Sequence, residues 1–134
     1  MIAAIHAGWK GAFKGIINRT LNFMIKKGCT PKNITAVIGP CISVKNYEVK
    51  KDFIKKLIKK DGKNKKFFKK IQNKDFFNLK KYIYSQLKTL NIKKIDIINK
   101  DTFNPKNNFF SARRSISRNE NDYGRNISVI MINS

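Results

Sequence analysis

The sequence predicts an α/β (α+β) fold in which a mixed β-sheet is flanked by helices. Two observations carry this prediction: short apolar runs without polar alternation, and longer segments whose apolar residues recur at helical spacing. The apolar runs are residues 1–7, 34–38, 95–98 and 126–132. The helical segments are residues 11–27, 51–60 and 78–90. Alternation of the two types indicates strand–helix–strand units with right-handed crossovers where the strands are parallel neighbours.

The first run, residues 1–7, is apolar at successive positions, which is typical of a buried strand in the centre of a sheet. The helix that follows is expected to end at Gly28, because glycine commonly terminates helices. The strand over residues 34–38 is expected to end at Gly39-Pro40. The last run, residues 126–132, should pair inside the same sheet.

The most basic stretch, residues 59–70, mixes lysines with Phe67 and Phe68. Aromatic and cationic side chains together could stack bases and hold phosphates. We favour a solvated loop that the two phenylalanines tether to the body of the protein. Further on, residues 101–105 form a turn, and residues 109–114 form a short helical patch.

Length and composition indicate one domain over residues 1–134, since 134 residues with 41% hydrophobic content can bury a core. The two cysteines, Cys29 and Cys41, lack a Cys-x-x-Cys spacing, which suits a reducing compartment. The opening apolar run is too short for a secretory leader, and no stretch approaches a membrane span. We therefore expect a cytoplasmic protein without a membrane partner.

The formal net charge of +22 raises the question of nucleic-acid binding. Only five of the 30 basic residues are arginine, and the lysines are scattered through every segment together with Asn and Ile. This pattern indicates the drift of an AT-rich genome, since a dedicated nucleic-acid site would cluster arginine or carry a recognition motif. We expect nucleic acid to bind only non-specifically, at low salt.

The only histidine, His6, is expected at the C-terminal end of the first strand, where α/β folds place their chemistry. Gly8 and Gly11 would allow close backbone approach there. A neutral imidazole could bind a metal or move a proton. The alternative is a structural histidine, because one histidine does not make a metal site.

Two further groups of residues could carry chemistry. Cys41 follows a second strand end and could approach His6, and a Cys/His pair is the minimum for a thiol enzyme or part of a zinc site. The alternative is a small packing cysteine. The adjacent Arg113 and Arg114 suit recognition of phosphate or another oxyanion, and the alternative is an exposed pair.

The ordered motifs form a recognisable set. They are His-Ala-Gly-Trp-Lys-Gly from His6, Ile-Gly-Pro-Cys-Ile from Ile38, Tyr-Glu-Val from Tyr47, Phe-Phe-Ser-Ala-Arg-Arg from Phe109, and Gly-Arg from Gly124. In this order and spacing, the whole chain resembles the YfiH-like family of laccase-domain (polyphenol oxidase) proteins. That family is similar to purine nucleoside phosphorylases that also deaminate adenosine.

The resemblance implies a zinc site held by two histidines and one cysteine, beside which a purine nucleoside (adenosine, inosine or guanosine) binds and reacts with phosphate. It implies that His6 is a catalytic residue and the third metal ligand. Copper is disfavoured, because the sequence holds no cluster of histidines. The substrate-binding residues implied are Gly8, Trp9, Lys10, Cys41, Arg113, Arg114 and Arg125.

The sequence departs from the family pattern in three ways. The family's first two metal ligands lie upstream of the His-Ala-Gly-Trp motif and have no counterpart here, Cys41 is not at a ligand position, and Ala112 stands where the family has tyrosine. We therefore expect the C-terminal part of a laccase domain, weakly active or inactive alone, and possibly completed by a separately encoded N-terminal half. A basic nucleic-acid-binding module and a Cys/His thiol enzyme are the alternative functions.

Overall fold

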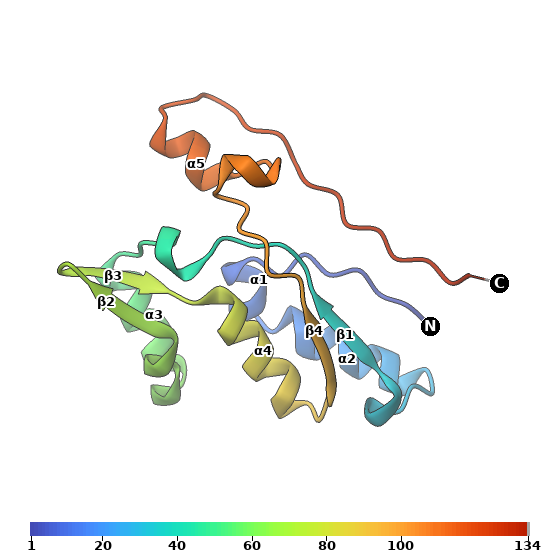
Figure 1. The fold of residues 1–134 in the computed structure, drawn as a ribbon. Helices are drawn as coiled ribbons and strands as arrows, with labels where there is room; N and C mark the ends of the chain where they lie inside the picture. The colour runs from blue at the N-terminus through green and yellow to red at the C-terminus, as the bar shows by residue number, and fades with distance from the viewer. Residues whose placement is uncertain (134) are drawn as a thin grey trace. The chain divides into compact units, whose positions relative to one another are not determined.

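Figure 1 shows the fold in a computed structural model, which describes residues 1–133. The helices are α1 (Trp9–Phe13), α2 (Ile16–Lys26), α3 (Lys51–Lys60), α4 (Leu79–Thr89) and α5 (Ala112–Ser117). The strands are β1 (Thr35–Ile38), β2 (Phe68–Ile71), β3 (Lys74–Phe77) and β4 (Lys94–Ile97). Short 3-10 turns are η1 (Pro31–Asn33), η2 (Val44–Asn46), η3 (Gly62–Phe67) and η4 (Pro105–Asn107). The predicted mixed α/β class is confirmed.

The chain divides into two compact units, which we describe separately. Unit 1 comprises residues 1–39, 83–98 and 127–133, and unit 2 comprises residues 40–82 and 99–126. The boundary falls within α4. The described strands do not form the single mixed sheet that the sequence predicts. Instead, each unit contains one pair of strands among the described residues.

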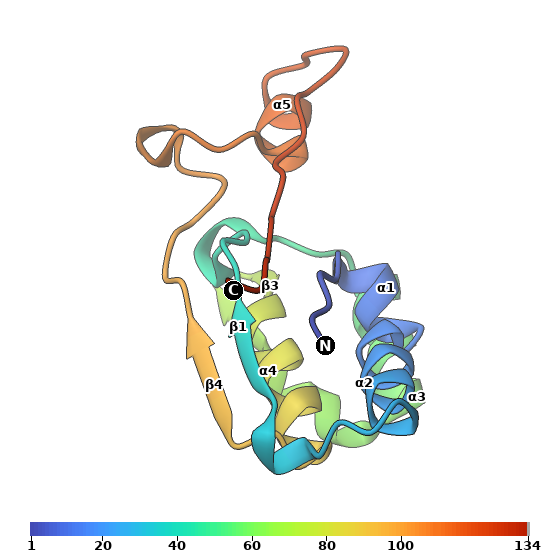
Figure 2. The same ribbon diagram turned by 90° about the vertical axis from the view of Figure 1, so that its right-hand side faces the viewer.

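Unit 1 contains the parallel pair, in which β1 lies beside β4 in register from Thr35 opposite Lys94 to Ile38 opposite Ile97 (Figure 2). Alternate residues of each strand point to the same face, and this register places Ala36 and Ile38 on the face that meets the core. The buried core residues are Ile17, Leu21, Met24, Ile38, Leu87 and Ile92. The apolar residues that define the predicted strands and helices therefore supply this core.

The single helix predicted over residues 11–27 is two helices in the structure. Helix α1 ends at Phe13, and α2 starts at Ile16 after Gly15, whose φ of +84° is a left-handed conformation suited to glycine. The predicted stop at Gly28 is confirmed, with a φ of +93°. The apolar spacing runs through the break, with Ala12 buried in α1 and Ile17 and Leu21 buried in α2, so periodicity alone misses it.

The two terminal strands that the sequence predicts, over residues 1–7 and 126–132, are absent from the described structure. These segments have no regular structure and are exposed: Met1 retains 58% of its accessible surface and Ile127 retains 88%. A strand needs a neighbour to pair its backbone N–H and C=O groups, and no described residue provides one. The expected central position of the first strand is therefore wrong for this chain by itself.

Unit 2 contains an antiparallel hairpin, β2–β3, whose first strand overlaps the stretch over residues 59–70 for which the sequence predicts a solvated loop. The two connecting residues, Gln72 and Asn73, have φ of +47° and +61°, which is the type I′ geometry that matches strand twist. The usual signal for this turn ends in glycine, and its absence explains the error. The predicted tethering role of Phe67 is confirmed, since it is 3% exposed and its ring packs edge-on against Tyr82.

Candidate functional site

His6 lies in unit 1, directly before the turn that leads into α1, and its side chain is exposed. A Cβ added at Gly8 would lie 3.3 Å from His6 Nε2, and one added at Gly11 would lie 3.4 Å from the His6 carbonyl oxygen. Any larger residue at Gly8 would therefore crowd the imidazole. Trp9 is half-buried, and the Lys10 ammonium lies over its ring, 5.8 Å from the centroid. The glycines keep this turn tight and His6 accessible.

Cys41 lies in unit 2 beside Asp101, in a junction that the sequence does not reveal. Its backbone N–H donates to the Lys100 carbonyl at 3.3 Å, and its carbonyl accepts from Thr102 N–H at 3.2 Å. Burial, together with the Asp101 carboxylate and against the opposing effect of Lys80, raises the pKa of the Cys41 thiol above 9.0. The thiol is therefore protonated at neutral pH, which argues against the thiol-enzyme alternative. His6 belongs to unit 1, so the Cys/His pairing stays a prediction.

Alkylation tests this assignment of Cys41. We expect iodoacetamide to modify Cys41 several-fold more slowly at pH 7 than it modifies free glutathione, because only the thiolate reacts. The rate should still be rising with pH above 9, and peptide mass spectrometry can follow it. A Cys41 more reactive than glutathione at pH 7 would instead restore the thiol-enzyme hypothesis.

Asp101 joins the segment after Cys41 to the turn before η4. Its Oδ1 accepts from the backbone N–H of Ser43 at 3.1 Å and of Phe103 at 2.9 Å, and its Oδ2 accepts from Asn46 Nδ2 at 2.7 Å. Burial acts to raise the pKa of Asp101, but these hydrogen bonds outweigh it and hold the pKa below the ordinary 3.8. The bond to Phe103 is the two-residue turn typical of aspartate, which the predicted turn over residues 101–105 partly anticipates.

The lowered pKa predicts how stability depends on pH. A carboxyl whose pKa is lower in the folded state stabilises that state above its unfolded pKa, and loses this effect as pH falls through the folded pKa. We expect Asp101→Asn to cost about 1–2 kcal/mol at pH 7 and to flatten the loss of stability below pH 3.8. Urea unfolding between pH 2 and 7 measures this, with the exposed Asp96→Asn as the control. Identical pH profiles for wild type and Asp101→Asn would contradict it.

The two adjacent arginines have different surroundings. The Arg114 guanidinium donates to three backbone carbonyls, those of Thr102 at 3.0 Å, Phe103 at 2.9 Å and Phe109 at 2.6 Å. Arg113 is exposed, donates from Nη1 to the Glu48 carbonyl at 3.0 Å, and lies over the Tyr47 ring at 5.1 Å. Arg114 therefore holds the chain together, and Arg113 retains donors for a ligand.

A pocket of about 270 Å³ adjoins Arg113 within unit 2. It is lined by Asn46, Glu48, Val49, Lys50, Phe103, Arg113 and Ser117. The carboxylate of Glu48 is paired with Lys74 at 3.1 Å, so the charge that the pocket lining offers to a ligand comes from the cations Arg113 and Lys50. Their charge suits an anionic ligand.

Arg125 is exposed and interacts with its own loop. Its guanidinium donates to the Tyr123 carbonyl, lies 3.9 Å from the centroid of the Tyr123 ring, and is 3.8 Å from an Asp122 carboxylate oxygen. The preceding Gly124 is needed for close packing, since a Cβ there would lie 2.5 Å from the Phe110 ring. Gly124 thus lets this loop pack against Phe110, while Arg125 interacts within the loop itself.

No group of three metal-ligating side chains exists within residues 1–133. The single histidine and the protonated thiol of Cys41 do not make the three-ligand set that a catalytic zinc requires. The side chains of residues 1–133 therefore do not make a catalytic metal site by themselves.

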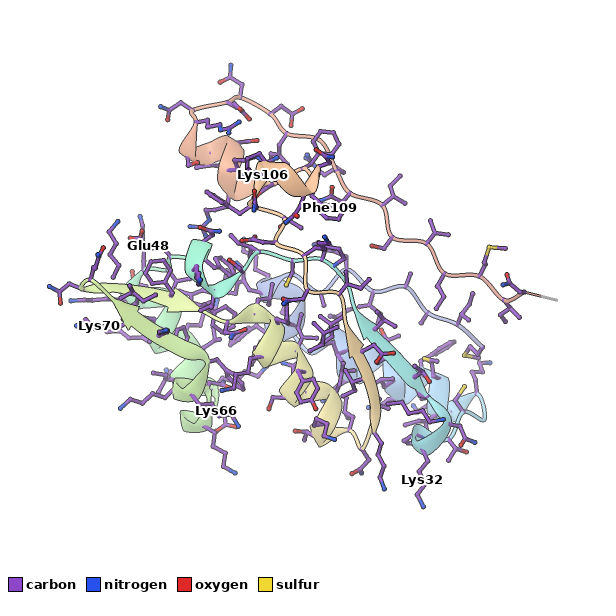
Figure 3. The ribbon with its side chains drawn as sticks, in the orientation of Figure 1. Lys32, Glu48, Lys66, Lys70, Lys106 and Phe109 are labelled. Atoms are coloured by element: carbon purple, nitrogen blue, oxygen red, sulfur yellow. The ribbon has the colours of Figure 1, made fainter. Side chains whose placement is uncertain are left out.

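The lysine-rich surface of unit 2 gives limited support to nucleic-acid binding. Lys66 and Lys70 are both exposed (Figure 3), but the Lys66 ammonium lies over the Phe67 ring, 5.2 Å from its centroid, and Phe67 is buried and cannot stack a base. What remains is charge, which attracts phosphate backbones without reading sequence. Separately, no helix over residues 1–133 has the length and apolar character to span a membrane.

Comparison with known proteins gives a consistent result. The profile of a family described as multi-copper polyphenol oxidoreductase laccase matches residues 1–133. A purine nucleoside phosphorylase of Rickettsia conorii is 37% identical over 129 residues, covering 95% of this chain and 52% of the relative. One from Haemophilus influenzae is 36% identical over 132 residues, covering 96% and 51%. One from Shigella flexneri is 30% identical over 115 residues, covering 84% and 45%. The chain thus spans about half the length of these relatives.

Proposed function

Because this chain belongs to the multi-copper polyphenol oxidoreductase laccase family, we propose that it supplies part of the active site of a purine nucleoside phosphorylase. The observation that carries this proposal is the match over residues 1–133, together with relatives named for that activity. The substrates are a purine nucleoside and phosphate. Both cysteines are free, in keeping with the cytoplasmic location we assign.

His6 is the residue of this chain that we assign to the metal of the completed site. The family implies a metal. We assign zinc rather than copper, because a zinc site needs few histidines whereas a multi-copper oxidase site needs several, and this chain has one. The remaining ligands must come from outside residues 1–133, so we derive no step through the metal. We expect the chain alone to be weakly active or inactive.

Arg113 is the residue that we assign to phosphate. In phosphorolysis, a phosphate oxygen forms a bond to C1′ of the ribose while the bond from C1′ to the purine nitrogen breaks, and the purine leaves with the electron pair and takes a proton. A guanidinium placed on the phosphate would hold this anion in position for attack. Arg113 and Lys50 line one pocket and offer this charge, whereas the Arg114 donors are used on carbonyls.

Adenosine deamination is a second reaction that we assign to the completed site, following the family resemblance. There, water adds to the purine carbon that carries the amino group, and ammonia leaves. This reaction needs no phosphate, so Arg113 should matter for phosphorolysis and be dispensable for deamination. The two activities can therefore be separated by one substitution.

Turnover by a completed enzyme tests the proposal. We would replace the matched portion of the Rickettsia conorii relative with this chain and measure release of purine base from inosine with phosphate. We expect base release that falls at least 100-fold in His6→Ala and about tenfold or more in Arg113→Met, against no change in the exposed Lys81→Met. Absence of base release from a folded chimera, or release that survives His6→Ala, would refute the proposal.

A further inference from the structure

Exposed apolar side chains are concentrated in unit 1. Most of the large hydrophobic residues exposed in the described structure belong to it, and those of its terminal segments are Met1, Ile2, Ile5, Ile127, Val129, Ile130, Met131 and Ile132. On the strand pair, Val37 is 58% exposed and Ile97 is 42% exposed. Exposed apolar residues concentrated in this way often mark an interaction site.

The distribution of charge shows that these segments are kept apolar. The three longest stretches without Asp, Glu, Lys or Arg are residues 1–9, 33–44 and 126–134, in a chain in which these four types make up 28% of the residues. They include both exposed terminal segments and the whole of β1. Lysine occupies exposed positions throughout the rest of the chain, so its exclusion here indicates that these residues are not solvent-exposed in the working protein.

The strand pair also has unpaired edges. Among the described residues the sheet consists of β1 and β4, so each strand has one edge without a strand neighbour. Parallel sheets are normally covered on both faces, and exposed edges are normally blunted by lysine, proline or a bulge. β1 has none of these residues, and residues 127–133 make no backbone hydrogen bond to another described residue.

We propose that β1, β4 and residues 1–5 and 127–132 form a docking surface for apolar β-strands of a second, non-identical polypeptide. In our proposal the partner supplies the half of the family's length that this chain does not match, so its identity rests on the proposed function. A second copy of this chain is disfavoured, because each copy carries a net charge of +22 and the two would repel. Strand addition pairs the free backbone groups and buries the apolar side chains together.

Hydrogen exchange of a reconstituted complex tests this surface. The probe is the portion of the Rickettsia conorii relative that this chain does not match, coexpressed with the full chain. We expect a 1:1 complex in which amides of residues 1–5, 35–38 and 127–132 exchange at least 100-fold more slowly than in the chain alone. A homodimer protected at the same amides, or no complex, or a complex without this protection, would overturn the proposal.

Two variants separate docking from folding. Val129→Pro removes an N–H that makes no hydrogen bond in the isolated chain, so its melting should be unchanged while affinity for the partner falls tenfold or more. Ile132→Lys should weaken binding similarly, whereas Ile116→Lys should not, although both isoleucines are 66% exposed. Equal effects of the two lysine variants would overturn the proposal. Hydrogen exchange and affinity do not depend on turnover, so a protected but inactive complex would count against the proposed function alone.

Discussion

Replacing Phe77 with alanine is expected to destabilise unit 2 by roughly 3–5 kcal/mol. Phe77 is fully buried, with 0% of its surface exposed, at the end of β3. Its ring lies within 5.1–5.9 Å, centroid to centroid, of four others, which are Tyr47, Phe53, Phe68 and Tyr82. Alanine would leave a cavity lined by rigid rings that cannot collapse to fill it, so the loss should lie in the upper part of the range for buried phenylalanine.

Urea unfolding followed by near-ultraviolet circular dichroism measures this loss, since Tyr47 and Tyr82 report on the environment of Phe77. The control is Phe23→Ala on α2, where the ring is 57% exposed and the Lys27 ammonium lies 5.8 Å from its centroid. That variant should change stability by no more than about 0.5 kcal/mol. Comparable losses in the two variants would show that the aromatic cluster does not form the core of unit 2.

Local periodicity predicts most of the helices and the buried strand pair. The predicted helix over residues 51–60 matches α3, and the helix predicted over residues 78–90 corresponds to α4 (Leu79–Thr89). The strands predicted over residues 34–38 and 95–98 correspond to β1 and β4 within a residue. These elements have apolar faces that other elements of the same chain can cover. The apolar pattern is therefore sufficient to predict that they form.

The errors occur where structure depends on something that periodicity does not contain. The hairpin turns through Gln72 and Asn73 without the glycine that usually marks such a turn. The terminal segments have a strand-like apolar pattern, yet a strand forms only beside a neighbour, and none lies within the described residues. In the first case the sequence lacks the usual turn residue, and in the second case it lacks the neighbouring strand.

In the candidate site too, local sequence motifs are predicted correctly and long-range interactions are missed. The sequence singles out His6 and the arginine pair, and the close approach of Gly8 to the imidazole supports the interpretation of that turn as a constrained one. It does not reveal Asp101, whose carboxylate binds two segments 58 residues apart, because long-range hydrogen bonds leave no local pattern. Nor does it distinguish Arg113 from Arg114, which are adjacent and chemically identical.

Substitution of Arg114 by methionine is therefore expected to destabilise unit 2 by about 3 kcal/mol, whereas Arg113→Met should cost no more than about 1 kcal/mol. Arg114 satisfies three carbonyls from a half-buried position, and methionine fills similar space without donating a hydrogen bond. Arg114→Lys should fall between, near 1–2 kcal/mol, because an ammonium keeps the charge without the planar fork that reaches all three oxygens.

Thermal unfolding and hydrogen exchange over residues 101–118 measure this difference, with the exposed Arg118→Met as a control, since its ion pair to Glu120 is 3.9 Å long and worth little. Arg114→Met should speed exchange in this segment, because Arg114 joins the turn before η4 to α5. Arg113→Met and Arg118→Met should not. If Arg113→Met proved the more destabilising, Arg113 would be the structural arginine and the assignment of phosphate binding to it would be wrong. Loss of phosphorolysis in Arg113→Met with stability retained would, in contrast, distinguish binding from scaffolding at two neighbouring residues of the same type.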